Sequence, residues 1–309
     1  MNDLQYGAVL RPEWSSEMVR RQHPSDGASV FALHETVAAA LRTRRYSSEP
    51  LILLHGVGNS GAIYGPVLGS FGELGPVLAP TMSPELLSTS AKSHGDAVGA
   101  LVEWLAELAP PPWRLVGHSM GGVLTGLILR THPEVVSSAV LLNSPLPGTV
   151  ARLRSGDKLD RNGRALLALK SIARITAFGR PRLPRFLRGA ELTIVRTALG
   201  GFVHDPGALD SRVISRAILR SRTTDGLDFL RLAREMPTWE AEPFTSCPVQ
   251  IILGDDDPLV PPSDFDAVMA SYPRASLHVA PDCGHFAHLE QPGLTLDLVT
   301  SFLSDIAAA

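Results

Sequence analysis

Residues 117–122 read GHSMGG, and in this stretch Ser119 stands between two glycines. The pattern G-x-S-x-G is typical of a sharp turn between a strand and a helix that presents the serine hydroxyl at the end of a sheet. Glycine is needed on both sides because a side chain would collide in so tight a turn. An apolar run precedes the motif at residues 115–116, and a helical pattern follows it over residues 121–131. This context favours a nucleophilic serine over a passive serine in a glycine-rich turn.

Short apolar runs alternate with amphipathic segments on both sides of this turn. The runs are typical of strands buried on both faces, and the segments have the spacing of helices. Strands are expected at Leu51–Leu54, 77–80, Trp113–Val116, Ala139–Leu142, Pro248–Leu253 and Leu277–Ala280, and helices at Gly95–Ala109, Gly121–Thr131 and Leu294–Ile306. Two further runs, Ser29–His34 and Val37–Arg42, are close enough to pair as a hairpin. The alternation predicts an α/β fold, with a mostly parallel central sheet and helices on both faces.

The chain divides into three expected parts. Residues 1–28 are polar and are interpreted as a loosely attached N-terminal arm. The α/β core comprises residues 29–147 and 240–309. Between them, residues 148–239 are helical in character, and a connection of that length is expected to be structured or functional. We interpret this stretch as an inserted helical cap, or lid, domain.

Charge separates the expected cap from the core. Residues 151–235 contain 16 Arg and two Lys against eight acidic residues, a net charge of +10 in a chain whose total is −3. One interpretation is simply that the composition favours arginine. The other is that a positive field lies over the site beneath the cap and attracts an anionic substrate or an acidic carrier.

Composition excludes several classes of protein. Of the 309 residues, 44% are hydrophobic and 19% are charged, which is enough apolar material for a large core. The slightly negative net charge argues against a nucleic-acid-binding protein, and no apolar run approaches the ~18 residues of a membrane span. The N-terminus has no signal-peptide pattern, and Cys247 and Cys283 fit neither a disulfide scaffold nor a zinc site. We therefore expect a cytoplasmic globular protein.

A serine hydroxyl is a poor nucleophile until a base removes its proton, so a histidine and an acid should lie downstream of Ser119. The acid is expected in residues 254–258 (GDDDP), directly after one expected strand. The base is expected at His285 in residues 283–286 (CGHF), just after another. His288 competes for this role but is more simply a packing residue. Because parallel strands end at one edge of a sheet, these side chains should converge there.

These motifs and their order resemble the α/β-hydrolase fold superfamily, from about Ser29 to the C-terminus, and the expected cap is the least similar part. The landmarks are His55-Gly56, the GHSMGG turn, the GDDDP turn and Gly284-His285. The resemblance implies that Asp257, three residues after the glycine of its turn, is the acid of a Ser119–Asp257–His285 triad. Asp255 and Asp256 are then solvated turn residues.

Acyl transfer also needs donors aimed at the oxygen that gains charge in the transition state. The residue after the nucleophile supplies one backbone N–H, here Met120. The resemblance implies that Val57 supplies the other and that His55 holds this loop. Four more residues are candidates for contact with substrate, although a plain turn or structural support is compatible with each: Gly56, Gly58, Asn59 and His118.

The function expected from these residues is that of a serine hydrolase that cleaves a carboxylic ester or thioester through an acyl-enzyme. The substrate is expected to be a small-molecule ester or thioester, and an anionic or carrier-bound form of it stays open. By the same resemblance, a carbon–carbon bond hydrolase, a lactonase and a cofactor-free haloperoxidase stay open. A ligand-binding protein of the same fold is a further, non-enzymatic alternative. No cofactor or metal is expected, since the histidines do not cluster at ligand spacing.

Overall fold

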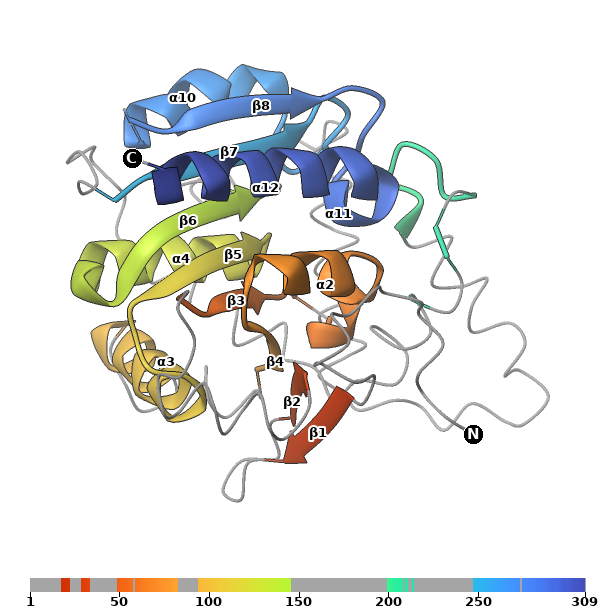
Figure 1. Ribbon diagram of the computed structural model, residues 1–309. Helices are drawn as coiled ribbons and strands as arrows, with labels where there is room; N and C mark the ends of the chain where they lie inside the picture. Colours follow the sequence, from red (N-terminus) through yellow and green to blue (C-terminus); the bar gives the residue numbers. More distant parts are fainter. Residues whose placement is uncertain are drawn as a thin grey trace.

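A single eight-stranded sheet forms the centre of the protein. The computed structural model describes residues 18–22, 29–33, 49–57, 59–82, 94–145, 199–207, 209, 210, 213, 247–272 and 274–308. The strand order is β1-β2-β4-β3-β5-β6-β7-β8 (Figure 1). The strands are β1 (Met18–Gln22), β2 (Ser29–Leu33), β3 (Leu51–Leu54), β4 (Val77–Thr81), β5 (Trp113–His118), β6 (Val136–Leu142), β7 (Val249–Gly254) and β8 (Ser276–Ala280).

The strands β3 to β8 pair in parallel, and every strand expected in this part of the chain is present. All four residues of β3 are 0% exposed, which agrees with a strand buried on both faces. Burial of each Leu or Ile side chain stabilises the fold by roughly 1.5–3 kcal/mol. The prediction of a mostly parallel sheet is confirmed.

Helices cover both faces of this sheet, as predicted. On one face α2 (Gly65–Phe71), α11 (Ala287–Glu290) and α12 (Pro292–Ala308) pack together, and α3 (His94–Leu108) and α4 (Met120–Thr131) lie on the other (Figure 1). The other helices that lie wholly within the described residues are α10 (Phe265–Ser271) and the short 3-10 helices η1 (Gly61–Tyr64), η2 (Gly72–Leu74), η3 (Pro133–Val135) and η6 (Pro262–Asp264). In the residues described, no helix is long and apolar enough to cross a membrane.

The N-terminal part differs from the expectation. Five residues of the expected arm form β1, which pairs antiparallel with β2, and β2 pairs antiparallel with β4. The strand β2 therefore has a partner on each side over residues 29–32. The expected hairpin partner, Val37–Arg42, lies outside the described residues. The sequence of β1 (MVRRQ) gave no strand signal because it is polar, and its place at the edge of the sheet tolerates such residues.

Most of the expected cap, residues 148–239, lies outside the described residues. The structure describes residues 199–207, 209, 210 and 213 within it. Five apolar residues of this part are buried in the hydrophobic core cluster: Leu199, Phe202, Val203, Leu209 and Val213. A helical cap over residues 148–239 stays a prediction.

Three imidazoles are fully buried, those of His55, His118 and His288. Burial disfavours the charged imidazolium, and it lowers the pKa of His55 to about 4 and that of His288 to about 3. Burial, helped by the neighbouring His288, also holds the pKa of His118 well below its usual range. All three are neutral in the folded protein near neutral pH.

These histidines predict a loss of stability on mild acidification. Below pH 6.5 the unfolded chain binds protons at these side chains while the folded chain does not. The free energy of unfolding should therefore fall by up to about 1.4 kcal/mol per histidine per pH unit. Urea unfolding at pH 7.5, 6.5, 5.5 and 5.0 measures this change. The variant His288→Leu should show a shallower pH dependence, and the control His278→Gln, at a partly exposed position of β8, should match the wild type. A free energy that is constant or rises on acidification would contradict the prediction.

Candidate active site

Ser119 lies at a strained turn between β5 and α4. Its backbone has φ 53° and ψ −117°, a conformation that is costly for a residue with a Cβ and is typical of a nucleophile elbow. The flanking glycines allow this turn because a Cβ at Gly117 would collide with the backbone of Gly121. A Cβ at Gly121 would in turn collide with the carbonyl oxygen of Leu54 in β3. The predicted strand–turn–helix context of the serine is confirmed.

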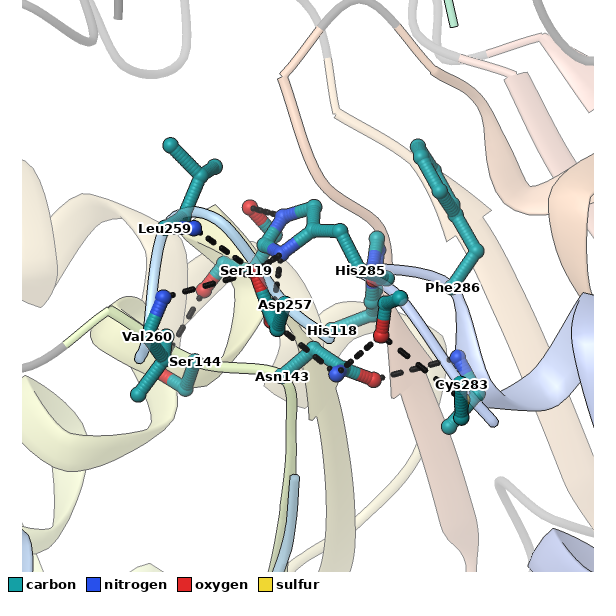
Figure 2. Close-up of polar contacts among 12 residues, drawn as sticks. His118, Ser119, Asn143, Ser144, Asp257, Leu259, Val260, Cys283, His285 and Phe286 are labelled. Carbon is teal, nitrogen blue, oxygen red and sulfur yellow. Dashed lines mark hydrogen bonds and ion pairs between the residues drawn. The ribbon is translucent and has the colours of Figure 1, made fainter. Parts of the chain in front are cut away.

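The structure brings together Ser119, His285 and Asp257, which lie far apart in the sequence (Figure 2). Oγ of Ser119 lies 2.9 Å from Nε2 of His285, and Nδ1 of His285 lies 2.9 Å from Oδ2 and 3.1 Å from Oδ1 of Asp257. With a proton on Nδ1, the imidazole donates a hydrogen bond to the carboxylate and its Nε2 accepts one from the serine hydroxyl. One tautomer of His285 therefore makes both hydrogen bonds. The exposed fraction is 9% for Ser119, 4% for His285 and 2% for Asp257, so the serine is the most accessible of the three.

Asp257 is held by donors on every side. Its Oδ1 accepts hydrogen bonds from the backbone N–H groups of Leu259 (2.8 Å) and Val260 (3.3 Å). Its Oδ2 accepts a hydrogen bond from Nδ2 of Asn143 (3.0 Å) in addition to the contact with His285. An ionised carboxylate only accepts hydrogen bonds, so this set of donors matches it and fixes its orientation toward the imidazole.

Asn143 is a site residue that the sequence analysis missed. It follows β6 with φ 45°, and its side chain is fully buried. Besides Asp257, its Nδ2 donates to the carbonyl oxygen of Gly284 (2.9 Å), and its Oδ1 accepts from the N–H of Ala287 (3.1 Å). One amide thus connects the acid to the loop that carries His285. The available signal was its place directly after a buried strand, at the edge where the other site residues were expected.

His118 holds the loop of His285 through a hydrogen bond and ring contacts. It is fully buried, and its Nε2–H donates to the carbonyl oxygen of His285 at 2.7 Å. Its ring also packs against those of His285 and Phe286, with centroids 5.1 Å and 5.0 Å apart. His118 was a candidate for substrate contact, and its burial favours the supporting role instead. His288 packs against His118 with ring centroids 4.5 Å apart, as a packing residue would, and neither of its ring nitrogens has a hydrogen-bond partner among the described residues.

The acid turn and the histidine loop are joined directly. A Cβ at Gly254 would collide with the carbonyl oxygens of Cys283 and Gly284, so glycine allows the close approach. The side chain of Asp255 accepts a hydrogen bond from the N–H of Cys283 (3.2 Å), and the N–H of Asp256 donates to the carbonyl oxygen of Cys283 (3.0 Å). Asp255 is therefore a structural residue rather than a merely solvated one. Neither Cys247 nor Cys283 is in a disulfide.

The loop after β3 approaches the elbow closely. A Cβ at Gly56 would lie 3.0 Å from Nδ1 of His118 and from Cβ of Ser119. The imidazole of His55 donates to the carbonyl oxygen of Gly56 (2.9 Å) and accepts from the N–H of Met82 (3.0 Å), which ties this loop to the end of β4.

The two expected oxyanion donors differ in their setting. Met120 is the first residue of α4, and the first N–H groups of a helix have no partner within it. Val57 lies in the loop after β3, where Nδ2 of Asn59 donates to its carbonyl oxygen at 3.2 Å. Asn59 is 4% exposed, and its Oδ1 has no hydrogen-bond partner among the described residues, so its contact with substrate stays a prediction. Gly58 lies outside the described residues.

The described residues contain no candidate metal site. No group of three His, Cys, Asp or Glu side chains there lies close enough together to hold a metal ion.

Comparisons with known proteins agree with this architecture. A model of the alpha/beta hydrolase family matches residues 51–298. The chain is 24% identical over 271 residues to the sn-1-specific diacylglycerol lipase of Mus musculus, covering 82% of this chain and 80% of the lipase. It is 28% identical over 291 residues to a 2-hydroxymuconate semialdehyde hydrolase of Pseudomonas sp., covering 89% of this chain and 95% of that hydrolase. The crystal structure of a putative alpha/beta hydrolase from Nostoc sp. superposes with a TM-score of 0.64 at 18% identity, covering 93% and 97%. The chain belongs to the α/β-hydrolase family.

Proposed function

We propose that this protein is a serine hydrolase that cleaves a carboxylic ester or thioester through an acyl-enzyme. The observation that carries the proposal is the continuous chain of contacts from Oγ of Ser119 to Nε2 of His285 and from Nδ1 of His285 to the carboxylate of Asp257. A hydroxyl paired with a neutral imidazole is activated when the imidazole takes its proton. The strained elbow supports the same role, since it holds the hydroxyl at the rim of the sheet.

The reaction runs in two balanced steps. In the first, Nε2 of His285 takes the proton of Ser119 while Oγ attacks the carbonyl carbon of the substrate, and the N–H groups of Val57 and Met120 stabilise the oxyanion. The tetrahedral adduct collapses when His285 returns the proton to the leaving alcohol or thiol, which leaves an acyl-enzyme. In the second step, His285 takes a proton from water, the hydroxide attacks the acyl carbon, and the proton returns to Ser119 as the acid departs. Asp257 stabilises the imidazolium in both steps.

The relatives support two substrate classes. One is named as a diacylglycerol lipase, which favours an ester. The relative of which the chain covers 95% is named as a 2-hydroxymuconate semialdehyde hydrolase, and this favours a carbon–carbon bond hydrolase as the second candidate. The basic balance of residues 151–235 supports an anionic substrate such as an acyl-CoA thioester. We expect the reaction to take place in the cytoplasm.

A substrate panel tests the proposal against its alternatives. The purified protein is incubated with p-nitrophenyl esters, acyl-CoA thioesters, a lactone and 2-hydroxymuconate semialdehyde, and product is measured. Rapid turnover of an ester or thioester supports the proposal. Turnover of the semialdehyde alone would favour the carbon–carbon bond hydrolase. Tight binding of ligands without turnover, together with no labelling by a fluorophosphonate, would overturn the proposal in favour of a ligand-binding protein.

Loss of the nucleophile should abolish activity. The variant Ser119→Ala keeps the fold but has no hydroxyl to attack the substrate, so we expect turnover to fall by at least about 10³-fold and fluorophosphonate labelling to disappear. Intact-protein mass spectrometry measures the labelling. Unchanged labelling or turnover in the variant would exclude Ser119 as the nucleophile.

The acid turn offers a matched pair of variants. Asp257→Asn replaces an acceptor beside Nδ1 with a group that disfavours the reactive tautomer, and we expect kcat to fall by about 10⁴-fold. Asp256→Asn, one residue away and partly exposed, should change kcat by no more than about twofold. Steady-state kinetics on the best substrate of the panel measures both. Equal effects of the two substitutions would contradict the assignment of Asp257 as the acid.

Asn143 should matter for activity through Asp257. The variant Asn143→Asp replaces a donor 3.0 Å from Oδ2 of Asp257 with a second carboxylate, so attraction becomes repulsion. We expect a loss of roughly 10- to 100-fold in kcat/KM, as for a buried hydrogen bond to a charged group. The control Ser138→Ala, on the strand β6 that Asn143 follows, removes a buried hydroxyl that has no hydrogen-bond partner among the described residues, and it should behave as the wild type. Wild-type kinetics in Asn143→Asp would exclude this role.

A further inference from the structure

The loop that carries His285 is held by a carboxylate that lies outside the expected triad. This histidine loop, residues 281–286, connects β8 to α11, and Glu290 is the last residue of that helix. Oε2 of Glu290 accepts a hydrogen bond from the N–H of Gly284 (3.0 Å), and Oε1 accepts one from the N–H of Phe286 (3.0 Å). The amides on both sides of His285 therefore bind one side chain.

The same carboxylate reaches a segment that is distant in the sequence. Oε2 of Glu290 also accepts a hydrogen bond from the N–H of His204 at 2.7 Å. His204 belongs to residues 199–207, which lie within the interval expected to form the cap, and Figure 1 shows this green segment beside α11. Glu290 thus joins the expected cap region to the histidine loop through charge-assisted hydrogen bonds, which are about twice as strong as neutral ones.

The backbone N–H of His285, between the two amides that Glu290 binds, contacts the segment of residues 199–207 directly. The N–H of His285 donates to the carbonyl oxygen of Phe202 at 2.6 Å. A Cβ at Gly284 would collide with that same oxygen, so the two backbones touch. The ring of Phe202 lies 6.3 Å from that of His285, centroid to centroid. Three consecutive N–H groups, at residues 284, 285 and 286, are therefore bound either by Glu290 or by the segment that Glu290 holds.

Two weaker contacts of the His204 side chain also join residues 199–207 to the acid turn and the histidine loop. Nδ1 of His204 lies 3.5 Å from Oδ2 of Asp256, and its Nε2 lies 3.9 Å from Oδ1 of Asp282. The side chain of His204 is 44% exposed, so these contacts add little on their own. The hydrogen bond from the N–H of His204 to Glu290 and that from the N–H of His285 to the carbonyl oxygen of Phe202 carry the attachment of residues 199–207 to the histidine loop.

We propose that Glu290 is a positioning residue that couples the placement of residues 199–207 to the alignment of His285 with Ser119. The proposal rests on the proposed function, because alignment matters only if His285 is the base. A displacement of the imidazole by about 1 Å can cost as much as 10²-fold in rate, since proton transfer requires a well-oriented contact. The segment that packs beside the base and the base itself then move as one unit.

The test compares Glu290→Gln with the matched control Gln291→Ala. A glutamine side chain has one acceptor oxygen and an NH₂ group, so it cannot accept all three hydrogen bonds. Gln291 is the next residue and also binds the histidine loop, through the exposed carbonyl oxygen of Pro281 at 2.8 Å, but it contacts none of the three amides. For each protein, the active sites are titrated with a fluorophosphonate, and kcat and KM are measured per titrated site.

We expect Glu290→Gln to lower both kcat per titrated site and the rate constant of labelling by about 10- to 100-fold, with KM within about threefold of the wild type. The low-field proton resonance of the His285–Asp257 hydrogen bond should shift or broaden in this variant. Gln291→Ala should retain wild-type values for all of these quantities. A shorter carboxylate, in Glu290→Asp, should restore part of kcat.

The outcomes separate the two proposals. If the wild type is not labelled at Ser119, the proposed function fails. If the wild type is labelled and Glu290→Gln has the same kcat per titrated site but a lower melting temperature, Glu290 is only a structural residue and the inference is overturned. If Glu290→Gln does not fold, Glu290→Asp decides: a reduced kcat per titrated site supports the inference, and a wild-type value overturns it.

Discussion

The parallel pairing of β5, β6, β7 and β8 is the constraint on which the site depends. Their register places Gly117 beside Leu141, Leu142 beside Ile252 and Gly254 beside Ala280, so the four strands end at one edge of the sheet. The residue or loop that follows each strand contributes one polar group: Ser119, Asn143, Asp257 and His285. Side chains 166 positions apart in the chain thereby come within hydrogen-bond distance. No local interaction could bring them together.

Around this edge, side chains from other elements bind the backbone of the histidine loop on both sides of His285. Asn143 and His118 bind the carbonyl oxygens of Gly284 and His285, and Glu290 binds the amides on either side of His285. An irregular loop has no neighbouring strand to bind its backbone N–H and C=O groups, so these side chains supply the hydrogen bonds that a sheet supplies elsewhere. The imidazole is therefore placed by a buried or half-buried polar network, which limits its motion relative to Ser119.

The fold was largely predictable from the sequence because its signals are local. A run such as Leu51–Leu54 is typical of a strand buried on both faces, and the GHSMGG turn is typical of a strand–turn–helix junction. The choice of Asp257 over its two acidic neighbours came from family resemblance. The geometry now gives a physical reason for the choice, since Asp257 alone of the three contacts the imidazole of His285.

The remaining features could not be predicted because they depend on tertiary contacts. The strand β1 is polar and is stabilised by pairing with β2, not by its own composition. Asn143 and Glu290 lie in ordinary-looking contexts, and their roles appear only once distant loops meet. His118 and Asn59 were expected near the substrate because of their neighbours in sequence, and only tertiary contacts reveal that His118 binds the carbonyl oxygen of His285 and that Asn59 binds that of Val57.

The central claim is that the hydroxyl of Ser119 reacts within a site completed by His285 and by the amides of Val57 and Met120. A crystal structure of the protein after reaction with a fluorophosphonate tests this claim most directly. The account predicts a covalent bond from phosphorus to Oγ of Ser119, with one phosphoryl oxygen about 2.7–3.1 Å from both amide nitrogens. An adduct on a different residue, or an oxygen directed away from both amides while His285 has left Ser119, would contradict it.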